Sequence, residues 1–175
     1  MENKDEKDEE DRQLIALLLR RQPGRQLGTA LHTAIMRLVT SVAIEVVALR
    51  CVRDRTEILL RRCEQDAPSY PGQWHLPGTM MRIGEREDDA LRRLEAQESI
   101  GRVIRFRLVS PAFWMEERGW VCSLILLVEL DGQSSLGAQN QWFAVDALPE
   151  PLVPEHRDVF IPMAHDAFMS AAYGI

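Results

Sequence analysis

The chain has 175 residues and a mass of 20.0 kDa, enough for one domain with an appendage but hardly for two. Apolar residues make up 46% and charged residues 27%, the balance of a globular protein with a real core. These values exclude collagen-like, repeat-built and wholly disordered chains, and no apolar run reaches the roughly 18 residues of a membrane span, so we expect no membrane partner.

The net charge of −6 is concentrated at the N-terminus. Residues 1–11 hold seven acids and two lysines, a net −5, which leaves about −1 for the rest of the chain. We therefore expect an acidic disordered tail over 1–11 and no nucleic-acid partner. The three cysteines lack zinc-ligand spacing and no signal peptide precedes them, which favours a reducing, cytoplasmic location.

The pattern of residues 10–21 predicts a short helix with a broad apolar side, and residues 29–38 predict a second one capped by Thr29. Together they make residues 12–39 an N-terminal helical extension. Such an extension covers the main domain or makes a homodimer contact, and the sequence leaves both alternatives open.

From residue 40 the sequence becomes rich in β-branched residues. Residues 41–52 predict a long buried strand, and after a polar turn at Asp54-Arg55 residues 57–61 predict its hairpin partner. Residues 74–81 read as strand, sharp turn and strand.

Residues 87–100 carry the clearest helical pattern in the chain. At about 100° per residue, one side collects Glu87, Ala90, Leu91, Leu94, Gln97 and Glu98. An acid such as Glu98 on the apolar side of a helix is unusual and points to a function.

The remaining elements complete the predicted domain, residues 40–175. Strands are expected at 103–114, 120–130 and 141–145, with a hairpin at 115–119. A final helix is expected over 156–173, tolerating Pro162 near its first turn. This order predicts a mixed α/β sandwich.

Three stretches resemble the Nudix hydrolase family: Leu59-Leu60-Arg61-Arg62, the segment Gly72–Gly78 (GQWHLPG), and residues 142–149 (WFAVDALP). The resemblance covers roughly residues 40–173. It implies an α/β/α sandwich with a mixed sheet. It also implies Mg²⁺-dependent hydrolysis of a diphosphate linkage in a nucleoside diphosphate derivative, that is, a nucleotide sugar, a dinucleotide or a nucleoside triphosphate.

The family's signature is degraded in this chain. Glu85, Arg93 and Glu98 match it, but these are only three of its nine fixed positions; the others hold Thr79, Leu94, Glu95, Gln97, Ile100 and, one residue late, Gly101. A second register, shifted by one residue, matches Glu95, Glu98 and Gly101. We favour the first register because it keeps Ala90 and Leu94 buried, and Glu98 is matched in both.

The resemblance assigns roles to these residues. Glu98, Arg93 and Glu85 are the expected catalytic set, with Glu85 and Arg93 tying the loop to the helix. Mg²⁺, or Mn²⁺ in its place, would be held by Glu98 with help from Gln97 and a carbonyl near Gly78, since Mg²⁺ prefers hard oxygen ligands.

The sequence is also similar to a variant group, the GDP-mannose hydrolases, in Arg93-Leu94 and Glu98. That group uses a Gln-His pair in the loop before its last strand, whereas the corresponding loop here has glutamines but no histidine. His156 is therefore a candidate base on fold grounds alone, with an ordinary helix-start residue as the alternative.

Arg61 and Arg62 are the candidate phosphate contacts, because a guanidinium binds phosphate oxygens in pairs. Trp74 is a candidate stacking surface for a base, with core packing as the alternative. The expected partner is a nucleotide-type small molecule. The non-acidic Leu94 and Gln97 keep a second hypothesis open, a catalytically lapsed Nudix-fold domain that serves as a nucleotide sensor or protein-interaction module.

Overall fold

A computed structural model describes residues 34–67, 69–116 and 119–173, together with residues 12–14, 16 and 20. The acidic tail expected over 1–11 lies outside the described residues, as do residues 15, 17–19 and 21 of the first expected helix and residues 29–33 of the second. The described parts of those helices are helical at 12–14, at 16 and at 34–36. The domain boundary at residue 40 stays a prediction.

The first two strands form a hairpin, as expected. Strand β1 spans Ser41–Val52 and β2 spans Arg55–Arg62. The turn lies one residue earlier than predicted, at Arg53-Asp54, because Val52 pairs with Arg55 and leaves only two residues to close the hairpin. Both turn residues have positive φ, 48° and 64°, as a tight two-residue hairpin turn requires.

One mixed sheet organises the described part of the chain. Its strands run in the order β3-β2-β1-β6-β5, with β4 added to β1 and β7 added to β2; β1 and β6 are parallel and the other pairs antiparallel. The remaining strands are β3 Trp74–His75, β4 Gly78–Met80, β5 Val103–Glu116, β6 Gly119–Leu130 and β7 Asn140–Ala144.

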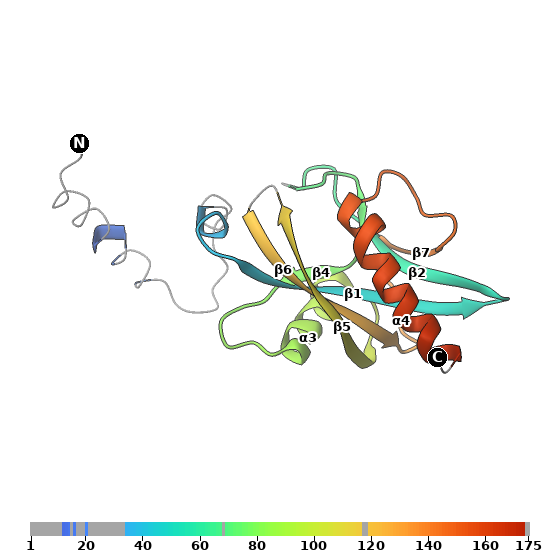
Figure 1. Ribbon diagram of the computed structural model, residues 1–175. Helices are drawn as coiled ribbons and strands as arrows, with labels where there is room; N and C mark the ends of the chain where they lie inside the picture. The colour runs from blue at the N-terminus through green and yellow to red at the C-terminus, as the bar shows by residue number, and fades with distance from the viewer. Residues whose placement is uncertain are drawn as a thin grey trace.

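Helices lie on both faces of this sheet (Figure 1). Helix α3, Glu87–Glu98, packs Ala90, Leu91 and Leu94 against one face, where they meet Val46 and Ala48 of β1. On the other face, Phe160, Ile161 and Ala164 pack against Val47 and Leu49 of the same strand. The alternation of β1 side chains between the two cores gives the α/β/α sandwich expected from the sequence.

The final helix differs from the prediction at its start. His156–Phe160 form a π-helical turn, η1, and the α-helix α4 follows over Ile161–Tyr173. Proline has no backbone N–H to donate, so Pro162 cannot continue a regular ladder of hydrogen bonds back into the preceding turn. The wider π turn immediately before it accommodates that gap.

Candidate functional site

Helix α3 is built to present its last turn to the sheet. Acids at Glu87, Asp88 and Asp89 favour a helix N-terminus here, and the buried Ala90, Leu91 and Leu94 fix which side faces inward. The helix ends where Ser99 adopts the left-handed conformation, φ 51° and ψ 45°. Glu98, the last residue of the helix, therefore lies next to the core.

Arg93 joins the helix to the loop before it. Its Nε and Nη2 donate to the two carboxylate oxygens of Glu85, both at 2.7 Å, and Nη2 also donates to the Met80 carbonyl at 2.9 Å. This pair holds the pKa of Glu85 below its usual value, chiefly through the hydrogen bonds from Arg93. The tie between Glu85 and Arg93 that the resemblance implies is present.

Thr79 accounts for one departure from the family signature. Arg93 Nη1 donates to the Thr79 hydroxyl at 2.7 Å, so the residue that replaces glycine joins the same network. Arg93 Nη1 also lies 3.5 Å from the amide oxygen of Gln97. Gln97 is exposed and faces Arg93, which differs from the inward position that the helical periodicity predicted.

The first signature register agrees with the packing. Leu94 has no exposed surface and packs in the core, where a carboxylate would be costly. Glu95, which the second register turns inward as a signature acid, instead accepts a hydrogen bond from the Val103 N–H at 2.6 Å. Glu95 thus ties α3 to β5.

Glu98 is a largely buried carboxylate beside a cation. Its side chain is 19% exposed, and its Oε2 lies 3.8 Å from Arg61 Nε. Within the described part of the chain, Oε2 is buried and has no hydrogen-bond partner. Burial raises the pKa of Glu98 to about 7, against the opposing effects of the Arg61 charge and the Gly78 N–H.

Arg61 stands in the middle of a row of side chains that cross three strands. In the β2–β3 register it pairs with His75, and in the β2–β7 register it pairs with Asn140. Directly paired residues point to the same face of a sheet, so His75, Arg61 and Asn140 lie together on the side where Arg61 meets Glu98.

His75 is neutral and keeps one ring nitrogen as an acceptor. Its Nδ1 lies 2.7 Å from the Leu76 carbonyl, which can only accept, so Nδ1 carries the proton and Nε2 a lone pair. Burial, and then the charge of Arg61, lower the pKa of His75 to about 4. Sequence reasoning missed His75; its place next to the Leu-Pro-Gly turn was the available signal.

Asn140 and Arg61 hold the end of the helix that carries Glu98. Asn140 Nδ2 donates to the carbonyls of Glu98 and Ser99 at 2.7 and 3.0 Å, and Arg61 Nη1 donates to the Glu98 carbonyl at 3.2 Å. The Gly137 N–H adds a bond to the Ser99 carbonyl. Sequence reasoning missed Asn140, because only the register of β7 brings it under α3.

Arg62 and Trp74 lie on the other side of the sheet from this row. Arg62 Nε donates to the Gly72 carbonyl at 3.2 Å, and its guanidinium lies 5.8 Å from the Trp74 ring. Trp74 packs edge-on against Phe143, with ring centroids 4.7 Å apart, at the border of the core. The structure therefore brings Arg61 to Glu98 but does not bring Arg62 and Trp74 there.

His156 is a buried core residue on the α4 side. Its Nδ1 accepts a hydrogen bond from the Leu76 N–H at 2.8 Å, so Nε2 carries the proton and faces Glu45 Oε2 at 4.0 Å. Burial lowers the pKa of His156 to about 3. Glu45 also meets Gly78, where a Cβ would collide with the Glu45 carboxylate. The His156 ring lies on the α4 side with its centroid 6.4 Å from that of His75, and its one lone pair already accepts the Leu76 N–H, so it is not available as a proton acceptor.

The donors around Glu98 fit a divalent cation only together with a phosphate ligand. The buried Oε2 of Glu98 is a hard acceptor left without a hydrogen bond among the described residues, which suits Mg²⁺. However, no group of three or more His, Cys, Asp or Glu that could hold a metal occurs in the described part of the chain. Mg²⁺ commonly takes one or two carboxylates plus substrate phosphates, and the Glu98 carboxylate suits that arrangement.

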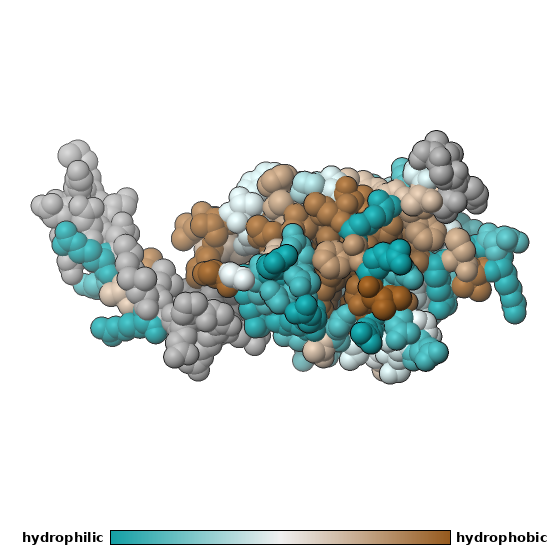
Figure 2. All heavy atoms as spheres, turned by 90° about the horizontal axis from the view of Figure 1, so that it is seen from below, coloured by the Kyte–Doolittle hydropathy of each residue, from teal (hydrophilic) through white to brown (hydrophobic). Residues whose placement is uncertain are grey.

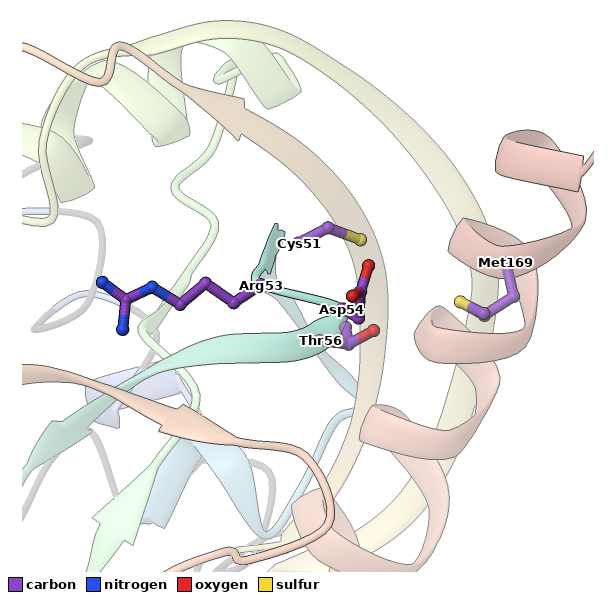
Figure 3. Close-up of a pocket in the computed structure, with 5 residues that line it drawn as sticks. All are labelled: Cys51, Arg53, Asp54, Thr56 and Met169. Carbon is purple, nitrogen blue, oxygen red and sulfur yellow. The ribbon is translucent and has the colours of Figure 1, made fainter.

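A separate hollow of about 480 Å³ lies at the opposite end of β1 and β2. Figure 3 shows Cys51, Asp54 and Thr56 at the hairpin with Met169 facing them from α4, while Arg53 points away. None of the expected site residues lines this hollow. The chemistry therefore places the candidate site at Glu98.

The sequence matches the family model of the NUDIX domain over residues 43–162. The chain therefore belongs to the NUDIX family, and the resemblance stated from its motifs is confirmed. No curated protein matches the chain significantly. Of the residues that the structure describes, none forms a helix both long and apolar enough to span a membrane.

Solved structures share the fold at low sequence identity. Shewanella oneidensis NrtR in complex with a 27mer DNA is 18% identical with a TM-score of 0.62, over 75% of this chain and 63% of that one, so the match spans less than two thirds of NrtR. The NUDIX domain of the same protein with ADP ribose is 16% identical, TM-score 0.58, over 81% and 99%. A MutT protein from Methanosarcina mazei Go1 is 16% identical, TM-score 0.59, over 73% and 95%.

Proposed function

We propose that this chain hydrolyses a diphosphate linkage in a nucleoside diphosphate derivative at the site formed by Glu98 and Arg61, beside which His75 lies. The observation that carries the proposal is the buried, hydrogen-bond-deficient Oε2 of Glu98 beside a guanidinium at the end of the signature helix. An acidic oxygen next to a cation suits a polyphosphate, whose oxygens need neutralisation while a water is activated.

Each residue has a distinct task in this proposal. Arg61 contacts phosphate oxygens. Its guanidinium stays oriented because its Nη1 already donates a hydrogen bond to the Glu98 carbonyl at the C-terminal end of α3. Glu98 would hold Mg²⁺ or Mn²⁺ jointly with the substrate's phosphates, and that cation would supply charge neutralisation and a more acidic bound water. Glu85 and Arg93 do not touch the substrate; they position the loop and helix.

Membership of the NUDIX family and the ADP ribose complex of the NrtR domain support this class of ligand, since ADP ribose is itself a nucleoside diphosphate derivative. The loops around the site determine the particular substrate, whether a nucleotide sugar, a dinucleotide or a nucleoside triphosphate.

The test is a hydrolysis screen of these three compound classes with Mg²⁺ and with Mn²⁺. We expect release of a nucleoside monophosphate from at least one compound, and a loss of at least 100-fold in kcat/KM for Glu98→Gln. Glu87→Gln removes the same charge from the first turn of α3. It should leave activity within about twofold, well below the tenfold change that corresponds to about 1.4 kcal/mol. No turnover with any compound and either metal would overturn the proposal.

A second candidate function is ligand binding without hydrolysis, as a nucleotide sensor or protein-interaction module. It is favoured by Leu94, which is core, and by Gln97, which faces Arg93, since both stand where the signature has acids. Calorimetry separates the two functions: nucleotide binding whose affinity is the same with and without Mg²⁺, together with no turnover, supports the sensor.

A further inference from the structure

His156 is a buried polar side chain that the proposed reaction does not use as a base. On the face drawn in Figure 2, hydrophobic and hydrophilic side chains are both exposed. His156 lies beneath the molecular surface instead: it is 5% exposed, and its partner Leu76 has no exposed surface. A polar group that is buried at such a cost usually has a defined partner and a reason to keep it.

His156 is bonded to the turn that joins β3 to β4, residues 76–78. Its Nδ1 accepts the Leu76 N–H at 2.8 Å. Burial, and then the neighbouring His75, lower the pKa of His156 to about 3, so the ring is neutral at ordinary pH and this nitrogen keeps its lone pair. A buried backbone N–H without an acceptor is costly. The bond therefore fixes the Leu76 peptide against the start of η1.

The same turn reaches Glu98 on the opposite side. Burial raises the pKa of Glu98, and the Gly78 N–H is one of the groups that oppose this rise, which places that N–H at the carboxylate. Pro77 alone separates Leu76 from Gly78, and its ring fixes its own φ. The Pro77 carbonyl also accepts the Val46 N–H at 2.8 Å. A displacement of the Leu76 peptide is therefore transmitted to the Gly78 N–H.

The turn is also seated closely against β1. A Cβ at Gly78 would collide with the Glu45 carboxylate and would lie 2.9 Å from the Ile44 carbonyl oxygen. Glu45 accepts a hydrogen bond from the Ser123 hydroxyl at 3.5 Å, and its other carboxylate oxygen faces His156 Nε2 at 4.0 Å. His156 and Glu45 thus approach neighbouring points of the same turn, one from η1 and the other from β1.

The place of His156 is set by the strand that precedes the turn. Trp74 of β3 makes two backbone hydrogen bonds, of 2.8 and 3.0 Å, with residues 151–153. His156 follows three residues later, at the start of η1, where its ring stacks on Phe160 with centroids 5.2 Å apart. Short π-helical turns are frequent at functional sites. Here the π turn places the imidazole at the Leu76 N–H.

We infer that His156 is a positioning residue of the candidate site, which holds the turn at residues 76–78 so that the Gly78 backbone faces Glu98. This inference rests on the proposed function, since Glu98 is the group whose surroundings are positioned. Because His156 is buried, it does not touch the substrate and acts through Leu76. Hydrolysis is sensitive to such placement, since a misplacement of about 1 Å at a reacting centre can cost about 100-fold in rate.

The first test needs no substrate. Amide hydrogen exchange, measured by NMR on the full chain, compares the parent with His156→Leu, which removes the acceptor, and with His156→Asn, which keeps one. We expect His156→Leu to speed exchange at Leu76 and Gly78 by about tenfold or more, because the turn then opens locally, and His156→Asn to stay within about threefold of the parent.

Phe160→Leu is the matched control. It weakens the packing of the same π turn, where Phe160 is 1% exposed and stacks on His156, but it leaves the hydrogen-bond acceptor in place. We expect exchange at Leu76 and Gly78 to stay within about threefold of the parent in this variant, even where its thermal midpoint falls.

The second test uses a substrate found in the hydrolysis screen. We expect His156→Leu to lower kcat by about tenfold or more with KM within about threefold, since Arg61 still contacts the phosphates while the backbone that faces Glu98 has moved. His156→Asn should restore kcat to within about threefold of the parent, and Phe160→Leu should keep it there.

Circular dichroism establishes that each variant is folded. If His156→Leu does not fold, His156→Phe takes its place, because it keeps a ring against Phe160 without an acceptor. Unchanged exchange at Leu76 and Gly78 in the folded variant overturns the inference, as does an equal acceleration or an equal loss of kcat in Phe160→Leu. A parent chain without turnover overturns the proposed function, and the exchange comparison then still decides whether His156 holds the turn.

Discussion

Arg93 is a positioning residue of the candidate site. Its guanidinium binds Glu85 through two hydrogen bonds and reaches Thr79 and Met80 as well, so one side chain joins the loop after β4 to the middle of α3. Arg93 is 14% exposed at its side chain, and such part-buried, bidentate pairs are among the stronger polar contacts in proteins.

We predict that Arg93→Ala lowers the free energy of unfolding by about 2–4 kcal/mol, because it leaves the Glu85 carboxylate without its main partner in a part-buried place. Urea denaturation measures the change. The neighbouring Arg92→Ala, which removes only surface ion pairs to Asp88 and Asp89, should cost less than about 1 kcal/mol. Equal costs for the two substitutions would contradict this role of Arg93.

His156 predicts how stability depends on pH. Burial lowers its pKa from 6.5 to about 3, so between these values the unfolded chain binds a proton that the folded chain does not. Stability is therefore complete above about pH 6.5 and falls as the pH drops, with a slope of up to about 1.4 kcal/mol per unit from this residue. His75, whose pKa is lowered to about 4, acts in the same direction.

We expect His156→Asn to flatten this slope between pH 6.5 and 5, since the Asn side-chain oxygen still accepts the Leu76 N–H but carries no titrating group. Urea denaturation curves at several pH values measure the slope for both proteins. Parallel pH profiles for the variant and the parent would show that His156 does not stay neutral in the fold.

At the scale of elements, the end of α3 is fixed by β7 and β2. The last carbonyls of a helix have no partner within it, and here Asn140, Gly137 and Arg61 supply donors to the carbonyls of Glu98 and Ser99. The position of the Glu98 carboxylate thus depends on a strand that begins 42 residues later in the chain.

We predict that Asn140→Asp, which keeps the shape but loses both hydrogen bonds to α3, destabilises the protein by about 1–3 kcal/mol. It should also speed amide hydrogen exchange at the C-terminal turn of α3. Gln139→Glu makes the same chemical change one residue away, where the side chain donates an exposed hydrogen bond to Glu64 and none to α3 that the structure shows, and serves as the control. Unchanged exchange at residues 95–100 in Asn140→Asp would contradict this anchoring.

At the scale of the whole molecule, binding of the metal depends on binding of the nucleotide. Among the described residues the site has one carboxylate, that of Glu98, so the metal needs the ligand's phosphates as well. We expect 5 mM Mg²⁺ alone to shift the thermal midpoint by less than about 1 °C. A nucleoside diphosphate ligand with Mg²⁺ should raise it by several degrees, because a ligand at 100 times its Kd stabilises the folded state by about 2.7 kcal/mol. A clear shift with Mg²⁺ alone would reveal a metal site that Glu98 does not explain.

The hydrophobic pattern determined much of the architecture. Strand β1 has the predicted ends, α3 starts at the predicted residue, and Ala90, Leu91 and Leu94 face the core as their spacing requires. Local patterns succeed at these places because burial and backbone periodicity agree. The local patterns fail at Gln97, whose amide oxygen lies beside Arg93 at the surface instead of facing the core. They also fail at residue 156, where a π turn precedes Pro162 in place of a regular α-helix.

Glu98 itself could be selected from the sequence, because an acid on an apolar helix face needs an explanation and both signature registers contain it. Its surroundings could not. Strand pairing joins residues that are far apart in the chain, so only the tertiary structure brings Arg61, His75 and Asn140 together at Glu98 and places Arg62, Trp74 and His156 on the other side of the sheet. Side-chain periodicity fixes a face within one element, whereas a site depends on the register between elements.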